Sequence, residues 1–221
     1  MKRGILIGAA LAVTFAAALG AVYGPELWAA YRFYEVLDRQ YADDRTRGGA
    51  WPRLQASCAH CHGPDGRSRN AHYPSLAGLS DSYLDEQLRA FAEGRRRDPQ
   101  MSPLAASMSE EQIKRLVAYY ARQRPVRNPD LVADAALEEQ GQATVAANGC
   151  AVCHGERLSG TDRGPLIAGQ GASYLADQLM AYKRGERQDP TQAMQGIASA
   201  MSEEEIRAAA RHIAGLDPAK D

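Results

Sequence analysis

The sequence predicts an all-α protein in which two similar helical domains follow an N-terminal apolar helix. The second half of the chain repeats the first at an offset of 91–93 residues, a period too long for a solenoid and suited to two fused globular domains. Within each repeat the apolar residues recur at helical spacing, and no run alternates between apolar and polar residues as a strand would. We therefore expect a membrane anchor and stalk helix over residues 1–47, a first domain over 48–124 and a second domain over 125–221.

The N-terminal segment begins with Met1, Lys2 and Arg3 and continues as an uncharged run from Gly4 to Pro25. About 20 residues at 1.5 Å each span about 30 Å, the thickness of a hydrocarbon core. A cleaved signal peptide has the same charged start but a shorter apolar region of about 7–15 residues, and cleavage stays open as the alternative. The length favours a transmembrane helix. The two positive charges then place the amino end in the cytoplasm, so we expect a single-pass protein of the bacterial inner membrane with both domains in the periplasm.

Helices are expected at matching places in the two repeats. Ser109 with Gln112, and Ser202 with Glu205, have the spacing of a capping box, in which the two side chains bond each other's backbone N–H groups at the start of a helix. Apolar residues at helical spacing indicate further helices over Asp81–Glu93, Ser173–Lys183 and about Asp130–Ala147. Between the repeats, residues 124–130 have the proline and polar content of a linker.

The charge of the chain is nearly balanced overall but differs between the repeats. A net charge of −1 argues against a nucleic-acid partner. Residues 48–125 carry 11 basic and 8 acidic side chains, whereas residues 126–221 carry 9 and 14. Because opposite charge steers encounter between proteins, the two repeats are expected to dock different partners.

The pattern C-x-x-C-H occurs at residues 58–62 and again at 150–154, and the two copies use all four cysteines of the chain. This pattern is the covalent attachment site of c-type haem, in which two thiols add to the porphyrin and the histidine binds the iron. A zinc ribbon also needs two C-x-x-C pairs, but they lie about 15–20 residues apart. A thioredoxin-like pair or structural disulfides would not require the repeated histidine. We expect two covalently bound haem c groups, attached through Cys58, Cys61, Cys150 and Cys153.

The haem irons are expected to have two axial ligands each. His62 and His154 are the proximal candidates, and a methionine as the second ligand would suit an electron carrier. Met101 and Met194 lie 39 and 40 residues beyond these histidines, in loops that precede the last helix of each repeat. A second aligned pair, Met108 and Met201, stands directly before the capping serines and is expected to fill the core.

Other repeated residues would support the haem ligands. Pro74 and Pro165 lie 12 and 11 residues past the two histidines and are placed to offer a backbone carbonyl to the second ring nitrogen. Arg96 and Arg187 would neutralise haem propionates, although a solvated charge run explains them nearly as well. His60, His72 and His212 have no counterpart in the other repeat and are not expected to be ligands.

Together these features resemble the di-haem cytochromes c that consist of two fused class I cytochrome c domains, the cytochrome c4 family. The resemblance covers about Trp51 to Leu216 and rests on the two haem motifs, the P-x-x-A-G and S-Y-L-x-x-Q-L stretches, and a methionine loop before a serine-capped helix. It implies an all-α fold, two haems with His62 and His154 as proximal and Met101 and Met194 as distal ligands, and a periplasmic electron carrier to terminal oxidases. Leu79 departs from the repeat, because Gln170 stands at the matching place.

The expected function is electron transfer in a respiratory chain, not catalysis. The protein would be a tethered carrier or the cytochrome subunit of a quinol oxidoreductase or terminal oxidase complex. Its expected partners are a quinol:cytochrome c reductase, a terminal oxidase and, through the N-terminal helix, the membrane. The alternative is a di-haem cytochrome c peroxidase, which needs one haem with an open distal position.

Overall fold

The computed structural model describes residues 54–130 and 135–218, together with short pieces between 19 and 38. The chain divides into two compact units, Met1–Arg53 and Leu54–Asp221. In the first unit every described residue is helical. The second unit contains both haem-attachment motifs. Its division into two domains at residues 124 and 125 stays a prediction.

The expected single-pass location in the inner membrane is wrong. Within the described parts of the chain, no helix is both long enough and apolar enough to cross a membrane. The longest helices there, Ala135–Ala147 and Glu203–Gly215, have 13 residues, or about 20 Å at 1.5 Å per residue, against a hydrocarbon core of about 30 Å. Most of the run from Gly4 to Pro25, on which the prediction rested, lies outside the described residues.

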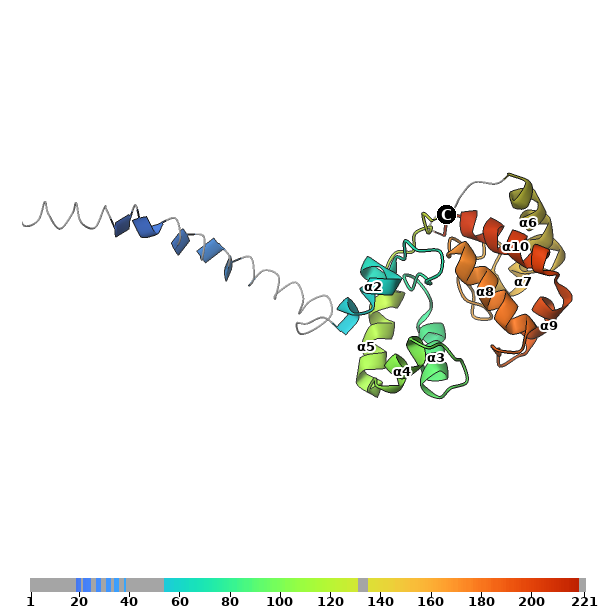
Figure 1. Cartoon of the computed structure of the whole chain (residues 1–221), viewed down its shortest axis with the longest axis horizontal. Coiled ribbons are helices and arrows are strands. Elements are labelled where there is room, and N and C mark those ends of the chain that lie inside the picture. Colours follow the sequence, from blue (N-terminus) through green and yellow to red (C-terminus); the bar gives the residue numbers. More distant parts are fainter. Residues whose placement is uncertain are drawn as a thin grey trace, which may run out of the picture. The chain divides into compact units, whose positions relative to one another are not determined.

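All regular secondary structure in the described residues of the second unit is helical, which confirms the all-α class (Figure 1). The first repeat contains the 3₁₀ turns η1 (Leu54–Ala56) and η2 (Pro64–Gly66) and the helices α2 (Ala59–His62), α3 (Asp81–Ala92), α4 (Met101–Ala106) and α5 (Glu110–Ala121). The second repeat contains α6 (Ala135–Ala147), α7 (Ala151–His154), α8 (Ala172–Lys183), α9 (Ala193–Ala200) and α10 (Glu203–Gly215).

The last helix of each repeat begins at a capping box, as predicted. The Gln112 N–H donates to the Ser109 hydroxyl at 3.3 Å, and the Ser109 N–H donates to the Gln112 side-chain oxygen at 2.8 Å. Ser202 and Glu205 make the same pair of bonds at the start of α10, at 3.2 and 2.7 Å. These bonds satisfy N–H groups that would otherwise lack a partner in the first helical turn.

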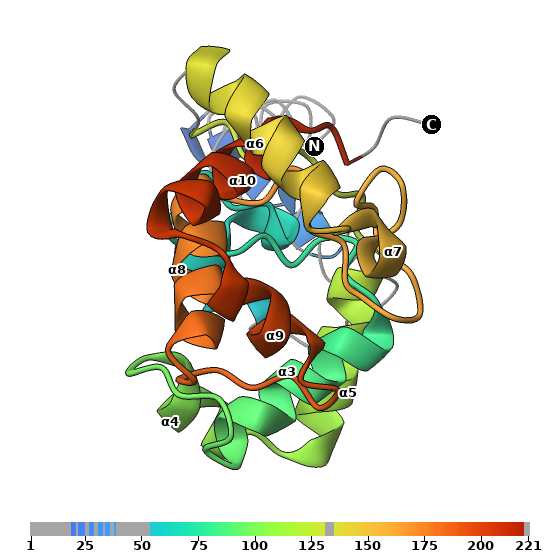
Figure 2. The same cartoon turned by 90° about the vertical axis from the view of Figure 1, so that its right-hand side faces the viewer.

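In the second repeat, α6 packs across α10 (Figure 2). Gly141 allows this close approach, because a Cβ at that position would collide with the Ala208 carbonyl oxygen and lie 2.7 Å from the His212 Cβ. The crossing therefore depends on a residue without a side chain in the middle of α6.

The two repeats share one hydrophobic core. Its buried members come from both halves of the unit and include Leu79, Leu84, Ile113, Leu116, Val117 and Tyr120 of the first repeat and Leu158, Leu166, Leu175 and Ile213 of the second. Met201, Ile206 and Ala209 form a second cluster between α8 and α10. Because the main cluster is continuous across both repeats, contacts between them are part of the core.

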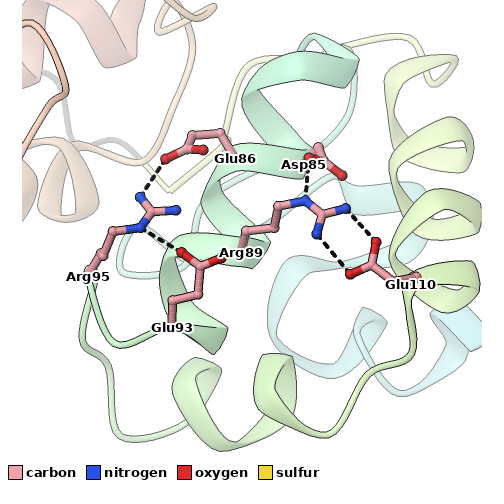
Figure 3. Close-up of polar contacts among 6 residues, drawn as sticks. All are labelled: Asp85, Glu86, Arg89, Glu93, Arg95 and Glu110. Carbon is pink, nitrogen blue, oxygen red and sulfur yellow. Dashed lines mark hydrogen bonds and ion pairs between the residues drawn. The ribbon is translucent and has the colours of Figure 1, made fainter.

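At the surface of the first repeat, Arg89 joins α3 to the start of α5 (Figure 3). Its guanidinium donates to both carboxylate oxygens of Glu110, at 2.8 and 2.7 Å, and to Asp85 at 2.7 Å. Arg95 likewise contacts Glu86 at 2.6 Å and Glu93 at 2.7 Å. These pairs are exposed to solvent, so they orient the helices more than they stabilise them.

Candidate haem-binding sites

The first haem motif places a buried histidine at the end of α2. The His62 Nδ1–H donates to the Pro74 carbonyl oxygen at 2.8 Å. Gly63 follows with a φ of 75°, and a Cβ there would collide with the Arg67 carbonyl oxygen, so glycine is required where the chain turns away. Because Nδ1 carries the proton, Nε2 keeps a free lone pair, as in histidines that bind metals.

The second motif has the same arrangement at the end of α7. The His154 Nδ1–H donates to the Pro165 carbonyl oxygen at 2.7 Å, and Gly155 has a φ of 84°. Both His62 and His154 are 7% exposed. The two repeats thus present equivalent, oriented imidazoles.

Burial lowers the pKa of His62 and of His154, since a charged imidazole is disfavoured away from water. The hydrogen bonds to the Pro74 and Pro165 carbonyls, and for His62 the charge of Asp98, act in the opposite direction but are outweighed. Both rings are therefore neutral near pH 7, which is the form that can bind a metal.

A cavity of about 1360 Å³ brings the second set of candidates together: Cys150, Cys153, His154 and Met194 all line it. Its volume exceeds the range of about 300–1,000 Å³ that holds a drug-sized ligand. Its wall includes Leu79, Tyr83 and Arg96 of the first repeat, so the cavity opens onto the junction between the repeats.

Both candidate methionines lie in the first turn of a short helix, not in a loop as expected, and an aspartate just before each helix accepts hydrogen bonds from its first N–H groups. Met101 begins α4, and its N–H donates to Asp98 Oδ1 at 2.8 Å. Met194 is the second residue of α9, and Asp189 Oδ2 accepts from the N–H groups of Ala193 at 2.9 Å and of Met194 at 3.4 Å. The two carboxylates therefore hold the first turn of each methionine-bearing helix in place.

The capping role of Asp98 and Asp189 was not expected from the sequence. The indication was there, because both belong to an Asp-Pro pair that recurs just before each methionine. Burial alone would raise the pKa of Asp189, but hydrogen bonds from the Thr191 hydroxyl and from backbone N–H groups outweigh it and lower the pKa. Asp189 is therefore ionised at neutral pH, the state that accepts these bonds.

Arg96 and Arg187 meet across the junction between the repeats. Each guanidinium donates to the glutamine of its own repeat and to a glutamine and a tyrosine of the other, namely Gln87, Gln178 and Tyr174 for Arg96, and Gln178, Gln87 and Tyr83 for Arg187. The distances run from 2.7 to 3.2 Å. Arg187 is only 6% exposed, and within residues 54–130 and 135–218 no carboxylate pairs with either guanidinium.

Of the remaining histidines and methionines, Met201 lines the same cavity as Met194. His60 and His72 are exposed, and His212 pairs with Glu138 at 2.7 Å. Met201 is buried in the second hydrophobic cluster, and Met108 packs against the main one. These positions fit the expected structural roles.

The residues present fit two covalently bound haems. The four motif cysteines are free of disulfides, each motif ends in a neutral, oriented histidine, and a large cavity adjoins the second motif. Two guanidiniums whose described partners are all neutral suit an anionic group at the junction, because burial of an unpaired charge is costly. A zinc ribbon would need four ligands together, and the described residues hold no group of three or more cysteine, histidine or acidic side chains.

Comparison with known proteins agrees with this geometry. The family model for Cytochrome c matches residues 53–121 and again 138–217. The chain is 38% identical to the thiosulfate dehydrogenase electron acceptor of Stutzerimonas stutzeri strain A1501, covering 81% of this chain and 89% of that protein. It is 34% identical to cytochrome c4 of Pseudomonas aeruginosa, covering 73% of this chain and 84% of that protein.

Solved structures show the same likeness. Reduced recombinant cytochrome c4 from Pseudomonas stutzeri superposes with a TM-score of 0.67 at 30% identity, covering 73% of this chain and 94% of that one. A thiosulfate dehydrogenase from Marichromatium purpuratum superposes with a TM-score of 0.63 at 33% identity, covering 72% of this chain but only 36% of that one. With two haem-attachment motifs in two matched domains, the chain belongs to the cytochrome c4 family and is an electron-transfer protein, not an enzyme, that carries two covalently bound haem c groups.

Proposed function

We propose that this protein accepts electrons from a thiosulfate dehydrogenase or a closely related sulfur-oxidising enzyme and passes them on. The observation that carries the proposal is its 35% and 38% identity to two proteins named thiosulfate dehydrogenase electron acceptor, over 84% and 89% of their lengths. The likeness to 36% of a solved thiosulfate dehydrogenase chain supports the same assignment.

The chain's own residues are proposed to hold the haems as follows. Cys58 with Cys61, and Cys150 with Cys153, form the thioether bonds, and the Nε2 atoms of His62 and His154 bind the irons. Met101 and Met194 are the second axial ligands. Each bound haem supplies an iron that takes up and releases one electron.

Arg96 and Arg187 are proposed to neutralise haem propionates at the junction between the repeats. Their partners there are neutral tyrosine and glutamine side chains, so no carboxylate of the described residues compensates either positive charge. An anion in the adjoining cavity would remove the cost of burying Arg187.

The second axial ligand in each repeat favours a carrier over the peroxidase alternative. A peroxidase needs a site where peroxide reaches the iron, whereas Asp98 and Asp189 fix a methionine-bearing helix in both repeats. The onward acceptor is proposed to be a terminal oxidase, and a quinol:cytochrome c reductase is the alternative donor. The unequal charge of the repeats supports separate docking of donor and acceptor.

Stopped-flow absorption of the purified holoprotein tests the proposal. A catalytic amount of thiosulfate dehydrogenase with thiosulfate should reduce both haems far faster than thiosulfate alone, and ascorbate should reduce the same sample to show that it is redox-competent. A holoprotein that ascorbate reduces but the enzyme does not would overturn the assigned donor.

A further inference from the structure

A single peptide unit joins the proximal histidine of the first haem to the second repeat. The carbonyl of Pro74 accepts from the His62 Nδ1–H at 2.8 Å. The N–H of the same peptide group, at Ser75, donates to the Gln170 side-chain oxygen at 2.8 Å, and the Gln170 amide nitrogen donates to the Ser75 carbonyl at 2.7 Å. Gln170 and Ser75 are both buried, so this chain of bonds is shielded from water.

The orientation of the Gln170 amide is fixed by its two partners. Its oxygen faces a donor and its nitrogen faces an acceptor, and the flipped amide would satisfy neither. Gln170 lies 95 residues from Ser75 and reaches it across the junction. The second repeat therefore supplies a hydrogen bond to the peptide group that orients a ligand of the first.

The described residues hold no reciprocal contact. In the repeat alignment Gln170 corresponds to Leu79, and Ser75 corresponds to Leu166. Leu79 and Leu166 are both members of the main hydrophobic cluster, and a leucine side chain has no group to offer the peptide between Pro165 and Leu166. Both proximal histidines therefore donate to an equivalent proline carbonyl, but only the peptide group after Pro74 also donates its N–H to a glutamine from the other repeat, among the described residues.

The physical consequence concerns the first haem alone. When the N–H of a peptide group donates a hydrogen bond, the peptide group becomes more polarised and its own carbonyl oxygen becomes a stronger acceptor. Hydrogen bonds linked in this way strengthen one another in a low-dielectric interior. A stronger bond from Nδ1–H makes the imidazole a more electron-rich ligand. Such a ligand favours oxidised iron and lowers the reduction potential.

We propose that Gln170 is a positioning residue that acts through the Ser75–Pro74 peptide group on His62, lowers the reduction potential of the first haem and makes that potential depend on docking of the second repeat. The proposal rests on the proposed role of His62 as an iron ligand. It is independent of the identity of the electron donor.

The test is Gln170→Met in the holoprotein, a change that keeps side-chain length and removes both hydrogen bonds. The midpoint potential of each haem is measured by spectroelectrochemistry, with the haems assigned by NMR. The first potential should rise, shifting the electron-exchange equilibrium between the haems by roughly threefold. Loss of a residue that bonds a metal ligand directly typically costs 10–100-fold in metal affinity or activity, and we expect a smaller effect here because Gln170 acts one bond further out. The His62 Nδ1–H resonance should also move towards that of a weaker hydrogen bond.

Asn128→Ala is the matched control. The uncharged Asn128 amide donates to the Asn70 carbonyl at 3.0 Å near the same junction and does not touch the Pro74–Ser75 peptide. This variant should leave both reduction potentials unchanged. If the first potential shifts as much as in Gln170→Met, the effect comes from any disturbance of the junction between the repeats, and the proposal is wrong. Leu79→Gln supplies the reverse test and should lower the second potential.

Two results separate failure of this inference from failure of the proposed function. If Gln170→Met leaves the first potential and the His62 resonance unchanged while both haems stay attached, the inference is wrong. If the potential shifts but thiosulfate dehydrogenase does not reduce the protein, the inference holds and only the proposed donor is wrong.

Discussion

The guanidinium of Arg187 in the second repeat donates to the Gln87 side-chain oxygen of the first repeat at 2.9 Å. Arg96 makes the matching bond to Gln178 at 2.8 Å, so the two repeats exchange equivalent contacts. The Tyr174 hydroxyl, which completes the cluster, lies close to both positive charges. Burial would raise the pKa of Tyr174, but the two guanidiniums outweigh burial and lower it. The junction therefore has a net positive potential, directed at the adjoining cavity.

This potential leads to the first prediction. Arg187→Gln should lower the reduction potential of at least one haem, because a nearby positive charge favours the reduced state, and should destabilise the holoprotein by about 3–5 kcal/mol if an anionic propionate loses its partner. Potentiometric titration and chemical denaturation measure the two effects. Arg115→Gln is the control, since Arg115 is exposed and pairs with Glu111. Unchanged potentials in the Arg187 variant would show that the guanidinium does not act on a haem.

The second prediction concerns the methionine ligands. Met101→Ala and Met194→Ala should each abolish the methionine-to-iron charge-transfer absorption of one haem and lower its potential, because a thioether ligand raises the potential. Met108→Leu and Met201→Leu should keep both, since these residues pack in the core. Near-infrared absorption of the oxidised protein measures the loss. If a core variant loses the band and its ligand counterpart keeps it, the assignment is reversed.

The third prediction uses the difference between the two capping boxes. Ser109→Ala and Ser202→Ala should each cost about 1 kcal/mol of stability. Only the second box titrates: the backbone N–H of Ser202, then its side chain, lower the pKa of Glu205, whereas Gln112 has no charge. A lowered folded-state pKa gives stability that is present above the unfolded-state pKa and is lost as the pH falls through the folded one.

The expected result is that Glu205→Gln reduces the loss of stability on acidification. Urea denaturation at a series of pH values between neutral and acid measures this. An identical acid response in the variant and the parent protein would mean that the Glu205 carboxylate contributes nothing to the start of α10.

The contacts that could be predicted from the sequence are those between residues a few positions apart along the chain. The Ser109–Gln112 and Ser202–Glu205 boxes each lie within four residues, and the distance from each haem motif to Pro74 or Pro165 is only 11–12 residues. The contact between Gln170 and Ser75 depends instead on how two repeats dock, and its only trace in the sequence was the mismatch of Gln170 with Leu79. The prediction of a membrane location was wrong for a related reason. It rested only on the composition of the run from Gly4 to Pro25, and composition alone does not determine whether a segment spans a membrane.

The crossing of α6 and α10 supports the last prediction. Gly141→Ala places a methyl group against the Ala208 carbonyl oxygen and the His212 Cβ, both on the packed face of α10. The helices would have to separate, and overpacking of this kind costs about 1–3 kcal/mol. Gly196→Ala is the matched control, since Gly196 is also within a helix but has no atom within 4 Å of an added Cβ. There, alanine should stabilise the protein by up to about 1 kcal/mol through its higher helix propensity. Thermal denaturation followed by circular dichroism should therefore move the two variants in opposite directions, and a neutral Gly141→Ala would mean that the crossing has room to spare.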